Sequence, residues 1–176
     1  STLAPGSTFK IITAASALEN LSGITDYMFT CTGATQVLDQ VIHDYNNEQH
    51  GRLSLEKAFT VSCNNAFAQC ALMLGDSALR KTAEDFGFND NFLFRDIVVE
   101  NSVYPTTDRN AVEIAWSGAG QSQIAATPLH MCMVAAAVAN DGMMMEPRLL
   151  MSVTSPSGTA RLYFTRKEYR RAVSEE

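Results

Sequence analysis

The stretch Pro5–Lys10, Pro-Gly-Ser-Thr-Phe-Lys, stands at the head of the segment around which the chain is organised. Its proline and glycine interrupt any preceding element. Apolar residues then recur at helical spacing at four positions: Ile11, Ala14, Leu18 and Leu21. The sequence therefore predicts a helix over 7–20 that begins at Ser7 and stops near Gly23.

Ser7 and Lys10 form a candidate nucleophile and base. They are three positions apart, so they share one face of the predicted helix, and Lys10 can reach the Ser7 hydroxyl. A helix N-terminus carries unpaired N–H groups and roughly half a positive charge, which would stabilise an alkoxide on Ser7. Ala14 and Ala17 continue the row and allow close packing, which would desolvate Lys10 and lower its pKa. The alternative is an N-cap serine followed by a solvated lysine.

A second Ser-x-x-Lys shows that the pattern alone is not specific. Ser54–Lys57 contains a charged residue and follows a polar entry, 49–52, to another predicted helix. Serine is a preferred N-cap residue, so we expect Ser54 only to cap that helix. Other residues must therefore distinguish Ser7.

The composition and net charge limit the kinds of protein that this chain can be. The chain has 176 residues and 46% hydrophobic content, which suits one domain or a large piece of one. Its net charge of −6 is spread out, and the basic residues near the C-terminus are interrupted by Glu168, so we expect no nucleic-acid partner. The longest apolar run, 131–139, is too short to span a bilayer. No signal peptide is visible, and because the chain starts close to Ser7 without a methionine, we expect an excised segment.

The spacing of cysteine and histidine predicts no metal centre. Four cysteines occur without a Cys-x-x-Cys pair: Cys31, Cys63, Cys70 and Cys132. We expect them to be buried free thiols that behave as small hydrophobic residues. The histidines form no ligand pair at helical spacing: His43, His50 and His130. The sequence therefore predicts neither a metal nor another cofactor.

Most of the remaining regular structure is predicted to be helical. Five further segments have helical period or start and stop signals: 55–61, 66–74, 76–84, 110–116 and 127–140. The last begins with Thr127-Pro128 and is nearly all apolar, so we expect it to be buried.

The other segments are predicted to be loops or short strands. Residues 24–52 show no sustained period and are expected to be irregular, with a short strand or two. Residues 88–109 are predicted to be a loop. Two strands, 148–154 and 161–165, are predicted to form a hairpin, and 166–176 a helix start or a tail.

Two further polar segments lie at the ends of predicted helices and are candidates to join Ser7 and Lys10 in one site. Ser62 and Asn64 lie where two predicted helices meet, and the turn 118–121 follows another helix. A second hydroxyl beside a serine–lysine pair can relay a proton to a leaving amine, and an amide can hold a peptide bond by donating and accepting at once. The alternative is that Ser62 and Asn64 only satisfy backbone groups at a helical break.

With Ser7 and Lys10, Ser62 and Asn64, and the turn 118–121 in this order, the sequence resembles the transpeptidase domain of penicillin-binding proteins. It resembles most closely the class B, elongation-type members. Ser7-x-x-Lys10 and Ser62-x-Asn64 correspond to two of the three signature motifs of the superfamily that includes β-lactamases. The resemblance runs in order along nearly the whole chain, through 4–19, 50–55, 61–68, 120–129 and 135–147. It implies an α+β fold, here the mainly α-helical portion of the domain with a short, incomplete antiparallel sheet near the C-terminus.

The resemblance implies acyl transfer on peptidoglycan stem peptides that end in D-Ala-D-Ala. Ser7 would attack the penultimate carbonyl with Lys10 as base, and Ser62 would pass a proton to the departing D-alanine. Asn64 would bind the donor peptide, with Gly120 and Gln121 also in the substrate site. β-Lactams would acylate the same serine. The resemblance further implies the extracytoplasmic face of the bacterial membrane, a membrane anchor absent from this chain, and a glycosyltransferase partner of the full-length protein.

The sequence departs from the family in its third motif. Lys-Thr-Gly is missing, and the nearest string, 81–83, lies inside a predicted helix. In the family that strand supplies one N–H of the oxyanion hole, whose loss costs roughly a hundred- to a thousandfold in rate. The Gly-Gln-Gly turn reads Gly-Gln-Ser at 120–122, and a cysteine often found after Cys31 has no counterpart, which leaves Cys31 unpaired. We therefore expect residues 1–176 to be a partial transpeptidase domain, truncated at both ends and weakly active or inactive.

Two other functions remain open from the sequence. A β-lactamase or β-lactam sensor would use the same serine, but hydrolysis needs a base for the attacking water, and no carboxylate stands in a recognisable position for it. A catalytically dead binding or scaffolding module would need no nucleophile at all.

Overall fold

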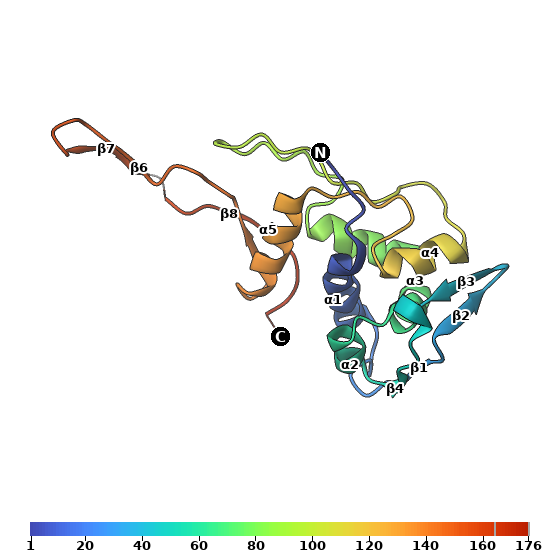
Figure 1. Cartoon of the computed structure of the whole chain (residues 1–176). Helices are drawn as coiled ribbons and strands as arrows, with labels where there is room; N and C mark the ends of the chain where they lie inside the picture. Colours follow the sequence, from blue (N-terminus) through green and yellow to red (C-terminus); the bar gives the residue numbers. More distant parts are fainter. Residues whose placement is uncertain (164, 176) are drawn as a thin grey trace.

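The computed structural model describes residues 1–163 and 165–175. Helices form the body of the molecule, four short strands lie at one end, and the β6–β7 hairpin projects away from the other (Figure 1). The helices are α1 (Lys10–Asn20), α2 (Leu55–Thr60), α3 (Asn64–Asp85), α4 (Ala111–Gly118) and α5 (Pro128–Val138). Short 3₁₀ turns are η1 (Gly6–Phe9) and η2 (Tyr45–Asn47). This mixture of helices and small sheets confirms the α+β expectation.

The predicted helix over 7–20 is present, but its first turn differs from the prediction. Residues Gly6–Phe9 form the 3₁₀ turn η1, and the α-helical part begins only at Lys10. Such tight turns are frequent at helix N-termini, where the first N–H groups lack intrahelical acceptors. One face of α1 is buried, through Lys10, Ile12, Thr13, Ser16 and Ala17. Ser7 therefore sits in a tight turn that leads directly into a helix anchored in the core.

The helices that follow largely match the prediction. α3 is interrupted at Gly75, whose φ of 74° and ψ of 166° lie outside the helical region, so the predicted stop there is confirmed. Asn110 and Glu113 form a capping box at the start of α4. Thr127 caps α5, with Pro128 in the first turn, as predicted. The expectation that this helix is buried all round is wrong, because only His130, Met133, Val134 and Ala137 are buried.

Residues 24–52 are more regular than expected. Four strands occur between Phe29 and Leu53: β1 (Phe29–Cys31), β2 (Ala34–Val37), β3 (Gln40–His43) and β4 (Gly51–Leu53). β1 pairs with β4 and β2 pairs with β3, both antiparallel, and Cys31 lies opposite Gly51. Strands of three or four residues are too short to show the alternation that identifies a strand in a sequence.

The C-terminal segment contains both a confirmed hairpin and an unpredicted strand. β6 (Ser152–Thr154) and β7 (Ala160–Tyr163) form the predicted hairpin; residue 164 of the predicted strand over 161–165 lies outside the described residues. The prediction of a helix start or tail after Arg166 is wrong for Glu168–Arg171, which form β8 and pair with β5 (Met143–Met145). Met144 and Ala172 are buried there, so packing against the core holds this polar strand in place.

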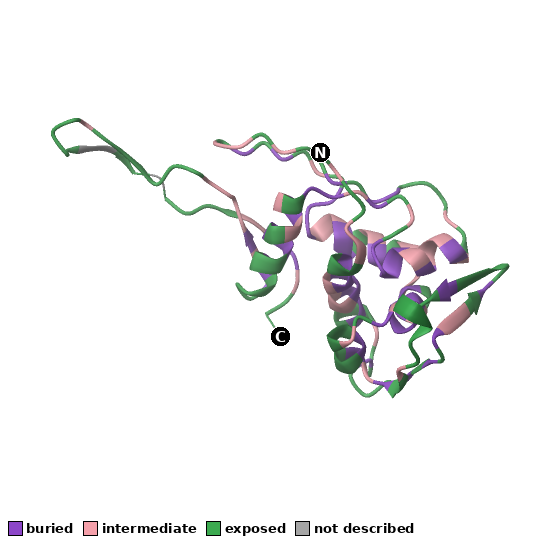
Figure 2. Ribbon diagram, viewed as in Figure 1, coloured by how far each residue is buried: buried purple, intermediate pink, exposed green. Residues whose placement is uncertain are grey.

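Buried residues concentrate where α1, α3 and α4 meet (Figure 2). The predicted loop over 88–109 adds aromatic side chains to this core. The Phe9 ring lies 5.5 Å from Phe88, edge to face, and 6.1 Å from Tyr104. Tyr104 is itself held by Asp76 and Arg109. Because Phe9 belongs to η1, the core fixes the backbone on which Ser7 is carried.

Candidate active site

The turn that carries Ser7 is tied to the turn after α4. The N–H of Gly6 donates to the carbonyl oxygen of Gly120 at 3.0 Å. Gly120 has a φ of +73°, and a Cβ added to it would overlap the carbonyl oxygen of Gly6 and lie 2.6 Å from the Cβ of Phe9. Only glycine meets both conditions without strain. The predicted substrate-site residues Gly120 and Gln121 therefore belong to a turn that directly contacts the turn carrying Ser7.

Lys10 connects α1 to the Ser-x-Asn segment. Its Nζ donates to the Ser62 carbonyl oxygen at 2.6 Å, to Ser62 Oγ at 3.0 Å and to Asn64 Oδ1 at 2.7 Å. The residue is only 1% exposed, and its Nζ lies 5.5 Å from the centre of the Phe67 ring. The structure thus brings Lys10, Ser62 and Asn64 together. Ser7 Oγ is not among the acceptors of Lys10 in the described residues, so the predicted direct contact is not made in this conformation.

Burial shifts the ionisation of Lys10. Desolvation lowers its pKa from 10.5 to about 8, although the Asp44 carboxylate opposes the shift. A lysine with such a pKa is partly neutral near physiological pH, and a neutral amine can accept a proton. The lowered pKa of Lys10 agrees with the prediction from the sequence that close packing desolvates this residue.

Ser62 occupies a backbone conformation that usually requires glycine. Its φ is +55°, in the left-handed region. The N–H of Ser62 donates to Phe59 O at 3.1 Å and that of Cys63 to Ala58 O at 2.9 Å, which is the Schellman pattern at the end of α2. A non-glycine residue here costs about 1–2 kcal/mol. The strain is located at the hydroxyl that contacts Lys10, as is common at functional sites.

Asn64 is held at both ends of its amide. Its Oδ1 accepts from Lys10, and its Nδ2 donates to the carbonyl oxygen of His43 at 3.1 Å. Its backbone N–H donates to the carboxylate of Asp44. The orientation of the amide is therefore set before any ligand arrives.

Ser7, Asn64 and Gln121 line one open hollow of about 810 Å³. The other walls were not predicted from the sequence: Leu38, Asp39 and Gln40 at the β2–β3 turn, Asn110 at the N-cap of α4, and Glu113 and Trp116 on α4. Of these, the single tryptophan and the Asn-x-x-Glu capping signal were visible in the sequence, but nothing linked them to Ser7. The prediction for the second Ser-x-x-Lys is confirmed, because Ser54 Oγ accepts from the Lys57 N–H at 3.2 Å and caps α2.

The cysteines do not all behave as expected. Cys31, Cys63 and Cys70 are buried free thiols, as predicted, but Cys132 is exposed on α5. Cys31 and Cys63 also come together with Asp44 and His50, so that one donor atom from each lies within 4.8 Å of the others. Linear spacing gave no signal for this cluster, because the pairing of β1 with β4 and the start of α3 assemble it.

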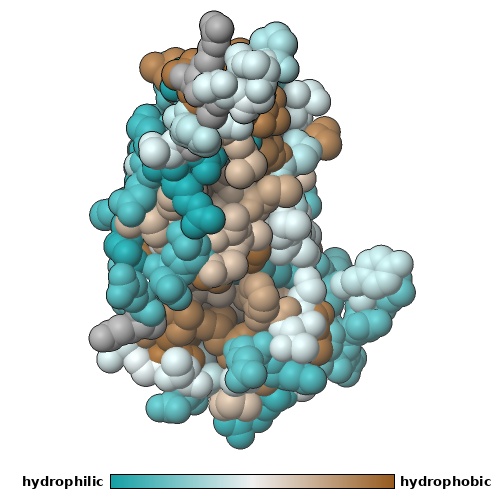
Figure 3. Space-filling model, turned by 90° about the vertical axis from the view of Figure 1, so that its left-hand side faces the viewer, coloured by the Kyte–Doolittle hydropathy of each residue, from teal (hydrophilic) through white to brown (hydrophobic). Residues whose placement is uncertain are grey.

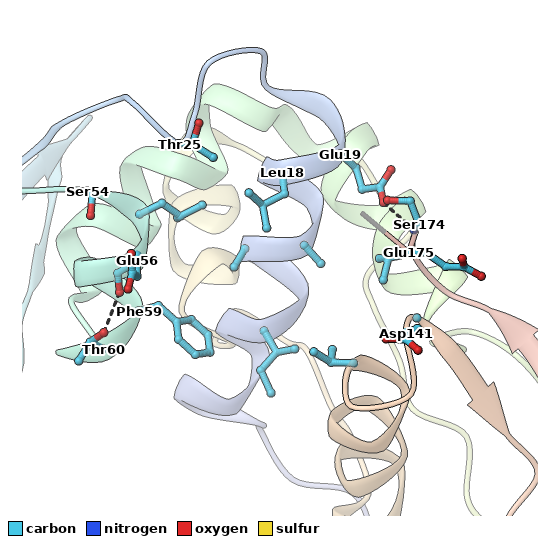
Figure 4. Close-up of a pocket in the computed structure, with 17 residues that line it drawn as sticks. Leu18, Glu19, Thr25, Ser54, Glu56, Phe59, Thr60, Asp141, Ser174 and Glu175 are labelled. Atoms are coloured by element: carbon cyan, nitrogen blue, oxygen red, sulfur yellow. Dashed lines mark hydrogen bonds between the residues drawn. The ribbon is translucent and has the colours of Figure 1, made fainter.

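A second, apolar groove of about 550 Å³ runs along another face of α1 (Figure 4). Leu18 from α1 and Phe59 from α2 point into it, and carboxylates stand at its margin (Glu19, Glu56, Asp141 and Glu175). The Ser174 N–H donates to Glu19 at 2.8 Å on one side. The side of the molecule on which α5 and the β6–β7 hairpin lie shows a run of hydrophobic surface between hydrophilic margins (Figure 3).

A serine in a tight turn at the head of a helix, a buried lysine on that helix and a Ser-x-Asn segment joined to the lysine define the class of serine–lysine acyltransferase domains. Comparison with known proteins narrows this class. The family model described as the penicillin binding protein transpeptidase domain matches residues 1–175, so the chain belongs to that family.

Three similar proteins each match almost the whole length of this chain. The chain is 34% identical to the peptidoglycan D,D-transpeptidase PbpA of Mycolicibacterium smegmatis over 99% of its own length and 36% of that protein. The crystal structure of PBPA from Mycobacterium tuberculosis superposes with a TM-score of 0.87 at 32% identity, covering 99% of this chain and 41% of that one. The D,D-transpeptidase domain of a peptidoglycan glycosyltransferase from Eggerthella lenta gives a TM-score of 0.88 at 32% identity, covering 99% and 46%. The chain thus spans between about a third and just under half of the length of these proteins.

Proposed function

We propose that this chain supplies the nucleophile side of a peptidoglycan D,D-transpeptidase site. The observation that carries the proposal is the buried Lys10 amine, which donates to Ser62 Oγ and Asn64 Oδ1 beside the hollow that Ser7 lines. Relatives named as D,D-transpeptidases support it, as do PBPA structures described as acyl-enzyme complexes with imipenem and penicillin G.

In the proposed reaction, Ser7 Oγ attacks the penultimate carbonyl of a D-Ala-D-Ala stem peptide. Neutral Lys10 accepts the serine proton, and Ser62 Oγ relays a proton to the nitrogen of the departing D-alanine as the peptide bond breaks. Asn64, Gly120 and Gln121 position the donor peptide. The amine of a neighbouring stem then attacks the acyl-enzyme, which forms the cross-link and frees Ser7. A β-lactam would acylate Ser7 in the same way.

The second half of the oxyanion hole is proposed to lie outside this chain. Ser7 can offer its own backbone N–H at the start of η1, but no Lys-Thr-Gly string is present to supply another. We propose that residues 1–176 are a partial domain and that the remainder covers the apolar groove along α1. The 36% share of the related PbpA and the 57% exposure of Leu18 support this. Loss of one oxyanion donor would reduce the rate by roughly a hundred- to a thousandfold.

The setting follows from the proposed reaction. Peptidoglycan is cross-linked outside the cytoplasm, so we place the activity on the extracytoplasmic face of a bacterial membrane, with an anchor and a glycosyltransferase partner belonging to the full-length protein. Among the described residues, every helix is too short or too polar to cross a bilayer.

Labelling with a fluorescent penicillin tests the proposal. The 176-residue chain should be labelled slowly, a form extended to include a Lys-Thr-Gly strand should be labelled efficiently, and Ser7→Ala should abolish labelling of both. Peptide mass spectrometry should locate the adduct on Ser7. Labelling that persists in Ser7→Ala would overturn the assignment of the nucleophile, and full, stable labelling of the short chain would overturn its partial character.

The same experiment separates the alternatives. A β-lactamase would release the acyl group within minutes, whereas a transpeptidase would retain it for far longer. Glu113 lines the hollow, but its carboxylate accepts from the Asn110 N–H at 2.9 Å and is committed to capping α4. A dead binding module would bind its ligand equally well with Ser7→Ala and would not be labelled.

A further inference from the structure

Four metal-binding side chains converge beneath the Ser-x-Asn segment. Cys31 ends β1, Asp44 follows β3, His50 precedes β4, and Cys63 caps α3. All but His50 are buried, and His50 is partly buried. We name Cys31, Asp44, His50 and Cys63 the donor cluster.

The donor atoms of the four side chains all lie within 4.8 Å of one another. Cys31 Sγ lies 3.0 Å from Asp44 Oδ2 and 3.4 Å from His50 Nδ1. Asp44 Oδ2 lies 3.4 Å from Cys63 Sγ and 3.8 Å from His50 Nδ1. Ligands of a tetrahedral zinc ion at Zn–S about 2.3 Å and Zn–N or Zn–O about 2.0–2.2 Å are about 3.3–3.8 Å from one another. The distances from Asp44 Oδ2 to the other three donor atoms, and from Cys31 Sγ to His50 Nδ1, are 3.0–3.8 Å and thus close to those around one zinc ion.

Neighbouring groups are arranged as they are around metal ligands. The Ala66 N–H points at Cys63 Sγ at 3.3 Å, and the His50 N–H points at Cys31 Sγ at 3.5 Å. Such donors stabilise thiolates. The other ring nitrogen of His50, Nε2, lies 3.6 Å from the Glu48 carboxylate, which is the kind of neighbour that metal-bound histidines usually have. Asn65 Nδ2 donates to Asp44 at 2.7 Å and orients that carboxylate.

We propose that the donor cluster binds one Zn²⁺ ion. Two thiolates and one imidazole favour zinc over the hard ions Mg²⁺ and Ca²⁺, which prefer oxygen ligands. All four corners are taken by protein atoms, which is typical of a structural zinc site and not of a catalytic one. On binding, each thiol gives up its proton to solvent, and the hydrogen bonds from both thiols to Asp44 are replaced by bonds to the ion.

The ion would support the Ser-x-Asn segment without touching the substrate. Cys63 stands between Ser62 and Asn64, whose side chains face Lys10, while its own sulfur faces the donor cluster. Asp44 also accepts the backbone N–H of Asn64. Zinc would therefore pin Cys63 and Asp44 together and keep the strained Ser62 in place. This inference does not rest on the proposed activity, because metal content is measured directly.

Metal analysis of the purified chain tests the inference. The chain is dialysed against excess Zn²⁺, freed of unbound metal and analysed by mass spectrometry for elements. About one zinc per chain is expected. Cys31→Ser and His50→Ala should each lose most of it, while Cys132→Ser, which alters the exposed cysteine outside the cluster, should keep it. Substitution by Co²⁺ should give the thiolate charge-transfer absorption and strong visible bands of a tetrahedral sulfur site.

Each outcome bears on the inference. Zinc content equal in Cys31→Ser, His50→Ala and wild type would overturn it, as would a wild-type chain without zinc that unfolds at the same temperature with and without Zn²⁺. Loss of zinc in Cys31→Ser could reflect misfolding, so circular dichroism of each variant is recorded. A folded, zinc-free Cys31→Ser supports the site, because the fold then survives without the ligand.

Discussion

Lys10 Nζ lies 2.6 Å from the carbonyl oxygen of Ser62, and this contact joins the helix that follows Ser7 to the segment that carries the second serine. Because Lys10 also donates to Ser62 Oγ and Asn64 Oδ1, a single buried amine organises both motifs. The three acceptors match in number the three N–H donors of an ammonium group. Proton transfer from Ser7 would require the neutral amine.

The pH dependence of acylation should report Lys10. Burial lowers its pKa to about 8, and the reactive form is the neutral amine above that pKa. The rate of labelling by a low concentration of penicillin should therefore rise with pH, about tenfold per unit below pH 8, and level off above it. Rates are followed by mass spectrometry. Lys10→Arg, which stays charged, should be inactive throughout, and a flat profile between about pH 6 and pH 9 would contradict the assigned base.

Ser62→Gly and Ser62→Ala should differ in stability although both remove the hydroxyl. Alanine keeps the left-handed strain at φ +55°, and glycine relieves it. We expect the glycine variant to be more stable than the alanine variant by about 1 kcal/mol in urea unfolding. Both should be acylated more slowly than wild type. Equal stability of the two variants would show that the left-handed conformation costs little here.

Gly120→Ala should damage the nucleophile turn. The added Cβ would overlap Gly6 O, in addition to the strain at φ +73°. Gly23→Ala is a matched control, because Gly23 has the same φ of +73° and nothing within 4 Å of an added Cβ. We expect about 1–2 kcal/mol of destabilisation from strain in both and about 1–3 kcal/mol more in Gly120→Ala. Urea unfolding measures both, and equal losses would show that the overlap is relieved by a local shift.

The two Ser-x-x-Lys serines should separate chemistry from stability. Ser7 is exposed and caps nothing, so Ser7→Ala should abolish labelling and change the free energy of unfolding by less than about 0.5 kcal/mol. Ser54 caps α2, so Ser54→Ala should cost about 1 kcal/mol and leave labelling intact. Labelling and thermal unfolding of both variants check this. The reverse pattern would exchange the roles of the two serines.

The helical frame could be predicted from the sequence because its signals are local. The cap at Thr127, the break at Gly75 and the cap at Ser54 each depend on residues within one or two turns, and all three are present. The desolvation of Lys10 could be predicted from the small residues on its helix. The identity of its acceptors depends on α3 and could only be suggested by the resemblance.

The remaining features are non-local, and the sequence contained no signal for them. β8 is a polar strand that is held by its partner β5 and by the buried Met144. The donor cluster draws its members from strand β1, two loops and a helix cap, so no spacing rule finds it. The walls of the hollow come from the β2–β3 turn and from α4, which meet Ser7 only in the folded chain.

The unequal exposure of the four cysteines makes the chain convenient for spectroscopy. Cys31, Cys63 and Cys70 are buried, whereas Cys132 faces solvent on α5. A maleimide dye applied to the native protein should therefore attach at one position, on the helix whose end borders the apolar groove. The unmodified sequence thus provides a site-specific fluorophore position from which binding of another segment at the groove can be followed in real time.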